Sequence, residues 1–433
     1  MQKVFTNGNC HLFNETLDVA QALFTNDESV VLTGSNEEVL QMKTPETLEV
    51  ELKGKTVIPA LYDVNSCVFN RIEKCLIDEG KEKFIENEAD IDENYEHFAN
   101  FKHYHKIFLK IQDEYIKNGI LTIFELQITA KSFTFWKKIA ESGELKIDVI
   151  GYVDIKSSKD VMDNNCRSYR KYKNCFRLAG YSVELDGEIT QARAWLKKPY
   201  KGSKTSVGYP KTNEEQLSFI IKTAIEEKRQ LFVIAHGDAA IEQFLRVSKA
   251  VFAEKKDDDK FRPALFGADM LTKKEIKEIK ELGISVCFEF SNVYQNSEQI
   301  KEVLGRGRFN KMLPLSLLLK SGVVTNVYYN DKNFLSPFKQ IQFVSTRVTK
   351  EGKKYHKKFK LESFEILKMM LKNGAFLAFE TEHKSSLENG KKANFLILNN
   401  PLTVDEYSTI SVEDVYKDNE KIYPIKKKKK NSK

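Results

Sequence analysis

The sequence predicts an α/β protein built on a (β/α)8 TIM-type barrel, with a small composite β-sandwich formed by both ends of the chain. Two observations lead to this fold class. From residue 59 onward, apolar runs rich in β-branched residues alternate with amphipathic runs of helical period. Short strands with turns precede this region and return after it, and we expect them to pair because a few strands alone bury little area.

The barrel strands are expected over residues 56–67, 120–127, 145–154, 176–185, 230–236, 263–268, 284–290 and 323–330. Helical periodicity separates most of them, most clearly over 213–230, 239–255 and 272–283. We therefore expect residues 1–58 and 386–425 to form the composite sandwich and residues 59–385 to form the barrel. Residues 426–433 are expected to be a disordered basic tail.

Composition excludes several classes of protein. The chain has 433 residues, of which 41% are hydrophobic and 30% are charged, so it can bury a large core. No apolar run reaches the roughly 18 residues that a membrane helix needs, and the N-terminus lacks the layout of a signal peptide, which predicts a cytoplasmic protein. The six cysteines are scattered without a C-x-x-C pair and are expected to be free thiols.

The net charge of +7 comes mostly from the tail, because residues 426–433 carry six lysines and the remaining chain has a charge of about +1. We do not expect the body of the protein to bind nucleic acid. A weaker hypothesis is that the tail attaches the protein to anionic surfaces.

The stretch PALYDVNSCVF (59–69) ends the first barrel strand with small polar residues. If the strand continues to residue 67, its alternation places Asp63, Asn65 and Cys67 on one face. The carboxyl ends of barrel strands are where active sites lie, so these residues mark a candidate site.

Seven segments in chain order resemble one known family. They are KVFTNGNCHLFN (3–14), LKGKTVIPALYD (52–63), GELKIDVIGYVD (143–154), RLAGYSVELDGEITQARAWLKKPY (177–200), HGDAAIEQFL (236–245), VLGRGRFNKMLP (303–314) and KSSLENGKKANFLILNNPL (384–402). Together they resemble the amidohydrolase superfamily, specifically the amidohydrolase family 3 branch with its N-substituted formamide deformylase-like enzymes. The resemblance implies a metal-dependent hydrolase acting on non-peptide C–N bonds, with one or two divalent ions such as zinc.

The positions where this resemblance places metal-binding or substrate-binding residues all hold other residues. Asn65 and Cys67 stand where the resemblance places two histidines after the first strand, and Ser182 stands where it places a lysine. Ile234 stands at the position of a histidine four residues before Asp238, and Gly267 at that of the histidine of the sixth strand. Asn292 replaces a substrate-side histidine, and Asn330 replaces the closing aspartate. Isoleucine and glycine side chains donate nothing to a metal, and Cys67 is the one strong ligand left. No metal site and no cofactor are therefore predicted.

His236 is the best single functional candidate, because it follows a barrel strand at the mouth of the expected pocket. Its simpler interpretation is a hydrogen-bonded loop histidine. Asp331 could replace the missing closing aspartate if the register slips by one residue, although such a slip turns a strand side chain to the other face. Asp238 directly precedes a helical run and is expected to cap that helix.

We therefore interpret the chain as a hydrolase-like pseudoenzyme that has lost metal-dependent hydrolysis and keeps its pocket for a small ligand or a partner. The partner could be a second copy, in a homo-oligomer, or an active relative, in a hetero-oligomer. The alternative is a hydrolase of amide or formamide type that acts on C–N bonds through an atypical site, with His236 and either Asp331 or Cys67.

Overall fold

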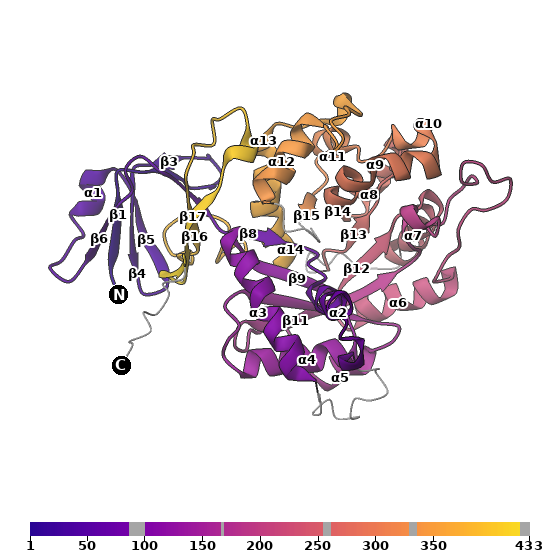
Figure 1. Cartoon of the computed structure of the whole chain (residues 1–433), viewed down its shortest axis with the longest axis horizontal. Coiled ribbons are helices and arrows are strands. Elements are labelled where there is room, and N and C mark those ends of the chain that lie inside the picture. The colour runs from indigo at the N-terminus through magenta and orange to yellow at the C-terminus, as the bar shows by residue number, and fades with distance from the viewer. Residues whose placement is uncertain (86–99, 166–168, 254–260, 329–335, 425–433) are drawn as a thin grey trace.

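The structure is a computed structural model that describes residues 1–85, 100–165, 169–253, 261–328 and 336–424. Within these residues, parallel strands lie side by side in chain order and curve into a nearly closed barrel (Figure 1). The strands are β8 (Leu61–Asp63), β9 (Ile120–Ile128), β10 (Asp148–Asp154), β11 (Phe176–Glu184), β12 (Gln230–Ala235), β13 (Ala264–Gly267), β14 (Ser285–Glu289) and β15 (Thr325–Tyr328). The predicted fold class is confirmed.

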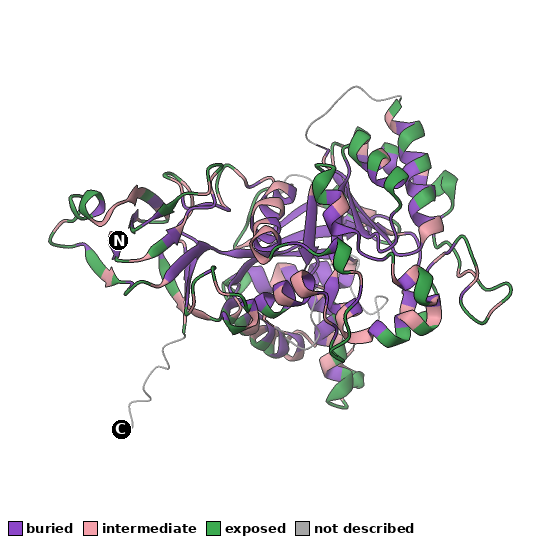
Figure 2. Ribbon diagram, turned by 90° about the horizontal axis from the view of Figure 1, so that it is seen from above, coloured by how far each residue is buried: buried purple, intermediate pink, exposed green. Residues whose placement is uncertain are grey.

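Helices surround the barrel and turn their buried faces to it, with exposed residues outward (Figure 2). They are α2 (Val68–Asp78), α3 (Phe101–Lys117), α4 (Ala130–Glu141), α5 (Lys159–Asn164), α6 (Glu214–Glu226), α7 (Asp238–Ala253), α8 (Lys273–Glu281), α9 (Phe290–Leu304), α10 (Arg306–Phe309), α11 (Leu315–Lys320) and α12 (Pro337–Thr346). Several begin with a capping box, in which the side chains of Thr129, Asn213 and Thr272 accept a hydrogen bond from the amide of the third helical residue, and their own amides donate one to its side chain. These caps satisfy amides that a helix leaves unpaired at its start.

Aromatic side chains fill the inside of the barrel. The rings of Tyr152 and Phe232 are stacked with their centroids 4.0 Å apart, and Phe266 lies 4.9 Å from Phe232. The barrel interior is therefore a packed core, and a cavity for a ligand can form only above it, at the ends of the strands.

A helical segment covers the seam between the first and last barrel strands. It comprises α13 (Ser363–Lys368), the π-helical turn η6 (Met369–Asn373) and α14 (Gly374–Ala378). Nδ2 of Asn373 donates to the carbonyl oxygen of Thr325 in β15 at 2.6 Å. A Cβ on Gly374 would lie 2.5 Å from the Cβ of Tyr62 in β8, so glycine permits this close approach.

Two further sheets lie at one end of the molecule, where the start and the end of the chain meet (Figure 1). One contains β5 (Ser29–Gly34), β4 (Ala22–Asn26), β1 (Lys3–Thr6) and β6 (Leu48–Glu51), with α1 (Asn36–Leu40) beside it; the other contains β18 (Glu420–Tyr423), β17 (Val412–Lys417), β16 (Phe395–Leu398), β7 (Thr56–Pro59), β2 (Asn9–His11) and β3 (Val19–Ala20). Phe5 of the first sheet packs edge-on against Phe395 and Tyr416 of the second, each at 5.1 Å. The predicted composite sandwich is present.

A buried ion network joins the sandwich to the barrel. Lys384 and Lys417 both donate to the carboxylate of Asp148, each at 2.7 Å, and Lys384 also lies 3.1 Å from Glu380. Burial raises the pKa of Asp148, but the two lysines outweigh it and hold that pKa well below its usual range. This network fixes β17 against the start of β10.

Among the described residues, no helix is both long and apolar enough to cross a membrane. The cysteines in this part of the chain, Cys10, Cys67, Cys75, Cys175 and Cys287, are all free, as predicted.

Candidate functional site

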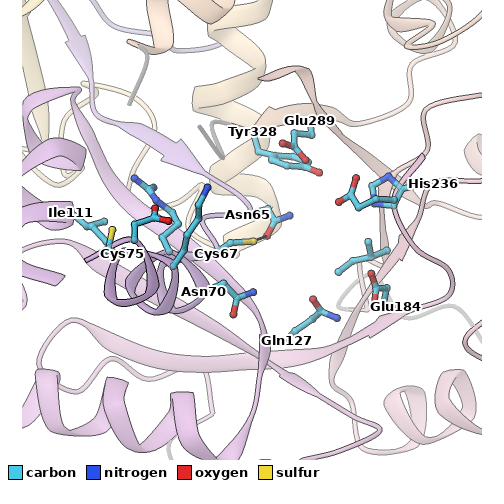
Figure 3. Close-up of a pocket in the computed structure, with 15 residues that line it drawn as sticks. Asn65, Cys67, Asn70, Cys75, Ile111, Gln127, Glu184, His236, Glu289 and Tyr328 are labelled. Carbon is cyan, nitrogen blue, oxygen red and sulfur yellow. Dashed lines mark hydrogen bonds between the residues drawn. The ribbon is translucent and has the colours of Figure 1, made fainter. Parts of the chain in front are cut away.

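A cavity of about 450 Å³ opens at the carboxyl ends of the barrel strands. Its walls come from the ends of β11, β12, β14 and β15, from the loop after β8, and from α2 (Figure 3). The lining residues are Asn65, Cys67, Asn70, Arg71, Lys74, Cys75, Asp78, Ile111, Gln127, Glu184, Glu188, Ile234, His236, Glu289 and Tyr328.

The prediction that the first strand continues to residue 67 is wrong. The strand ends at Asp63, and Cys67 adopts a left-handed conformation with φ of 48° immediately before α2. Asn65 and Cys67 nevertheless line the cavity, and the thiol of Cys67 lies 3.3 Å from Oδ1 of Asn65. Asp63 is buried outside the cavity lining and accepts a hydrogen bond from the hydroxyl of Tyr115.

Glu125 explains why the chain turns into α2 at this point. Its buried carboxylate accepts hydrogen bonds from the amides of Val68 and Phe69, at 2.9 and 2.8 Å, and from the hydroxyl of Ser66 at 2.6 Å. A carboxylate at a helix N-terminus satisfies unpaired amides and interacts favourably with the helix dipole. Glu125 on β9 therefore positions one wall of the cavity.

His236 is held in place through its backbone by Asp186. The two oxygens of this buried carboxylate accept hydrogen bonds from the amides of His236, Gly237 and Trp195, at 2.9, 2.8 and 2.8 Å. Burial raises the pKa of Asp186, although these hydrogen bonds oppose the shift. Asp186 thus ties the loop after β11 to the start of α7.

The His236 side chain pairs with a carboxylate that sequence reasoning missed. Its Nδ1 lies 3.2 Å from Oδ2 of Asp269, and both side chains are buried. Burial alone would lower the pKa of His236, but the hydrogen bond to Asp269 and the charges of Glu188, Asp269 and Asp186 raise it to about 10. The ring is therefore an imidazolium at neutral pH and acts as a hydrogen-bond donor rather than as a base.

Glu289 is a second group with an altered charge state. It stands at the end of β14, lines the cavity, and accepts a hydrogen bond from the hydroxyl of Ser291 at 2.9 Å. Burial and the negative charge of Glu188 raise the pKa of Glu289 to about 7, whereas Ser291 and His236 oppose the shift. The cavity thus holds a carboxyl group that is partly protonated at neutral pH.

Gly267 occupies the position of a family histidine, but its backbone cannot present such a side chain without strain. Its φ is +86°, and a Cβ there would lie 2.6 Å from the carbonyl oxygen of Ala235 and 3.0 Å from Nδ1 of His236. A side chain at residue 267 is therefore opposed chiefly by the backbone of Ala235, and it would also crowd the ring of His236.

The other substituted positions also fit a metal poorly. Ile234 lines the cavity with an apolar side chain. Oγ of Ser182 accepts from the amide of Gln127 at 2.8 Å and donates to the carbonyl oxygen of Tyr152 at 3.2 Å. Cys67 remains as a single thiol donor beside the neutral amide of Asn65, and these donors do not fit a catalytic divalent ion.

Within the described ranges, no group of three or more His, Cys, Asp or Glu side chains is arranged to hold a metal ion. Asn330 and Asp331 lie outside these ranges. Asn292 is on α9, where its Nδ2 donates to Glu188 at 3.3 Å.

The prediction that Asp238 caps α7 needs correction. Asp238 is the first residue of that helix, and its carboxylate accepts from the amide of Lys197 at 2.8 Å. It therefore anchors the loop that contains Lys197, while Asp186 accepts from the amide of Gly237 immediately before α7.

Asp269, Glu188 and Glu289 are charged residues around His236 that sequence reasoning missed. Each had a usable signal, because Asp269 directly follows a predicted strand, Glu289 lies within one, and Glu188 comes three residues after another. Carboxylates at successive strand ends converge in a barrel, so a search of strand ends would have found them.

Comparisons with known proteins agree with the fold. A crystal structure of an uncharacterized metal-dependent hydrolase from Pyrococcus furiosus superposes with a TM-score of 0.76 at 16% identity, covering 93% of this chain and all of that one (100%). Another from Pyrococcus horikoshii OT3 gives a TM-score of 0.70 at 17% identity and covers 94% and 99% of the two chains. At these identities the likeness shows the fold alone.

Sequence comparison identifies the family. YtcJ of Bacillus subtilis (strain 168) is 22% identical over 248 residues, which are 54% of this chain and 46% of YtcJ, so the match spans about half of that relative. The narrower resemblance to formamide deformylase-like enzymes stays a prediction. The model of the amidohydrolase family matches residues 90–423, which is most of the chain and both of its structural parts, and the protein therefore belongs to the amidohydrolase family.

Proposed function

We propose that this protein is a pseudoenzyme of the amidohydrolase family, whose barrel cavity binds a small ligand without metal-dependent hydrolysis. The observation that carries the proposal is the relationship between Gly267 and His236. A Cβ at residue 267 would lie 2.6 Å from the carbonyl oxygen of Ala235 and 3.0 Å from Nδ1 of the His236 imidazolium. The positive charge of His236 thus lies close to residue 267, the position at which the resemblance places a metal ligand.

The donor chemistry supports the same proposal. A catalytic divalent ion needs several convergent imidazole or anionic ligands and an open position for water. Ile234 and Gly267 supply none, and the hydroxyl of Ser182 is occupied by backbone groups. The cavity itself is retained, with polar walls of both charges.

The test is elemental analysis of the full chain, before and after incubation with zinc, manganese and iron salts and gel filtration. The same preparations are assayed on amide, formamide and ester substrates. We expect well under one equivalent of metal and no turnover. Stoichiometric metal together with turnover would overturn the proposal.

A second candidate function is a hydrolase that acts on amide or formamide C–N bonds without a metal. The buried pair of His236 and Asp269 favours it, because an imidazolium beside the cavity could protonate the nitrogen that leaves when water attacks the carbonyl carbon. This candidate predicts turnover that His236→Gln abolishes and that His383→Gln, a change of an exposed histidine, preserves. Turnover that survives His236→Gln would exclude it.

A further inference from the structure

A second cavity, of about 560 Å³, lies at an edge of the composite sandwich. Its walls come mainly from β6 and β18, which are edge strands of the two sheets, and from Lys146 in the loop before β10. Figure 1 shows the sandwich at one end of the molecule and α7 of the barrel at the other. Ligand cavities usually have volumes of about 300–1,000 Å³, so this sandwich cavity is large enough for a small molecule.

The wall formed by β6 is apolar although it is open to solvent. Leu48 and Val50 are two residues apart on the strand and therefore point to the same face, and Val50 packs against the core between the sheets. Leu48 thus also faces inward, yet it is 50% exposed. Ile422 and Pro424 line the cavity from the β18 side. An inward-facing leucine that is half exposed marks an apolar surface suited to a ligand.

A buried lysine supplies positive charge to the sandwich cavity. Lys3 of β1 lines the cavity and is only 7% exposed. Its ammonium group donates to the carbonyl oxygen of Asn419, and the carboxylate of Glu420 lies 3.9 Å away, which is beyond hydrogen-bond distance. Burial lowers the pKa of Lys3, and Glu420 opposes this shift only in part. Because an ammonium group has three donors, Lys3 can bind a closer anion in addition to Asn419.

The other charged side chains of the sandwich cavity also favour an anion. Lys146 is exposed and forms no ion pair within the described ranges, whereas Lys421 is paired with Asp414 at 2.7 Å. Glu420 is the one acidic residue among the described residues that line the cavity, against three lysines. An apolar wall beside an excess of cations is complementary to a molecule that has both an alkyl chain and an anionic group.

We propose that the sandwich cavity binds a free fatty acid, a single alkyl chain whose carboxylate lies against the ammonium group of Lys3 and whose hydrocarbon covers Leu48 and Ile422. The carboxylate gives a buried cation a charged hydrogen-bond partner, and the alkyl chain removes apolar side chains from water. One buried cation in a cavity suits one such molecule, whereas an anionic membrane is attracted by clusters of exposed cations. This site is separate from the barrel cavity, so the inference does not rest on the proposed function.

The test compares three probes that share one eight-carbon chain and differ in charge. They are octanoate, 1-octanol and octylammonium. Binding to the full chain is measured by calorimetry at neutral pH, at concentrations below those at which the probes form micelles. We expect octanoate to bind at least about tenfold more tightly than octanol, and octylammonium to bind most weakly because Lys3 repels it. Octanol or octylammonium binding as tightly as octanoate would overturn the inference.

A first pair of variants tests the charge. Lys3→Met should weaken octanoate binding by about tenfold or more and leave octanol binding unchanged. Burial of the ammonium group already costs free energy, so the apolar methionine should preserve the fold, and octanol binding reports that the cavity is intact. Lys249→Gln removes an exposed lysine of α7 and should change neither affinity. Equal octanoate affinities for Lys3→Met and Lys249→Gln would overturn the inference.

A second pair of variants tests the apolar wall. Leu48→Asn should weaken the binding of both octanoate and octanol by about fivefold or more, because it removes apolar surface that the alkyl chain covers. Leu40→Asn is the matched control, since Leu40 is also an exposed leucine but lies at the end of α1 outside the cavity lining. Both leucines are exposed, so neither change should unfold the protein. Equal affinities of the two variants for octanoate would contradict the proposed site.

Other occupants of the sandwich cavity would give different results. Residues 425–433 directly follow Pro424, which lines the cavity. If octanoate binds only to a chain that lacks residues 425–433, that segment is the occupant and the fatty-acid inference is overturned. It is also overturned if octanoate does not bind and Leu48→Asn dissociates a dimer in sedimentation, or if anionic vesicles bind and dispersed octanoate does not. Each of these outcomes leaves the proposed function of the barrel cavity untouched.

Discussion

Nδ1 of His236 and Oδ2 of Asp269 lie 3.2 Å apart, in side chains that are 8% and 9% exposed. The two residues come from the ends of neighbouring strands, β12 and β13, which are paired in register. Because of this contact, His236 is a buried, charged residue of the cavity wall and not an ordinary loop histidine.

The first prediction concerns the protonation of His236. Its imidazole should titrate near pH 10 in an NMR pH series, because its pKa is raised to about 10. Asp269→Asn removes the largest favourable contribution and should bring that pKa down toward the ordinary value near 6.5. A midpoint near 6.5 in the unmodified protein would contradict the assigned pair.

The same pair predicts a dependence of stability on pH. Because the pKa of His236 is higher in the folded than in the unfolded state, its protonation stabilises the fold fully below pH 6.5. This contribution is lost as the pH rises toward the raised pKa of about 10. Urea unfolding of the unmodified protein should therefore lose stability over this range relative to His236→Gln. Equal slopes for the two proteins would show that the pair is not coupled to folding.

Gly267→Ala should destabilise the fold by about 3 kcal/mol, because it combines a left-handed backbone with the close approach to Ala235. Gly283→Ala is the control, since Gly283 also has positive φ but a Cβ on it would meet nothing within 4 Å, and this change should cost only about 1 kcal/mol. Urea denaturation of both variants measures the difference. Equal losses would mean that the space around residue 267 is not restricted.

Asp148→Asn should cost about 3–5 kcal/mol, because it leaves Lys384 and Lys417 buried without their shared counter-charge. The pKa of Asp148 is lowered, so its contribution is present above the unfolded value of 3.8 and is lost as the pH falls below it. The stability difference between the two proteins should thus shrink in acid unfolding experiments below pH 3.8. A difference that is constant with pH would contradict this origin.

Glu125→Leu should destabilise the protein by about 3 kcal/mol, because the hydroxyl of Ser66 and the first amides of α2 lose their acceptor. Glu125→Gln retains one acceptor oxygen and should cost less. Amide hydrogen exchange in α2 gives a local measurement, and protection there should fall in the leucine variant. Unchanged protection would show that α2 begins without help from Glu125.

The barrel strands were predictable because buried parallel strands are short apolar runs that stand out between amphipathic helices. The runs over 120–127 and 176–185 correspond closely to β9 and β11. The first strand was less predictable, since the left-handed backbone of Cys67 and the capping of α2 by Glu125 depend on a contact between two separate segments.

The sequence by itself determined the barrel, the composite sandwich and the residues that stand at the family's ligand positions, because periodicity and residue identity are local properties. Only the tertiary structure decided that His236 meets Asp269, that Glu188 acts on Glu289, and that Gly267 is closed to a side chain. These relationships arise where strand ends converge and water is excluded, and burial there shifts the pKa values of the side chains.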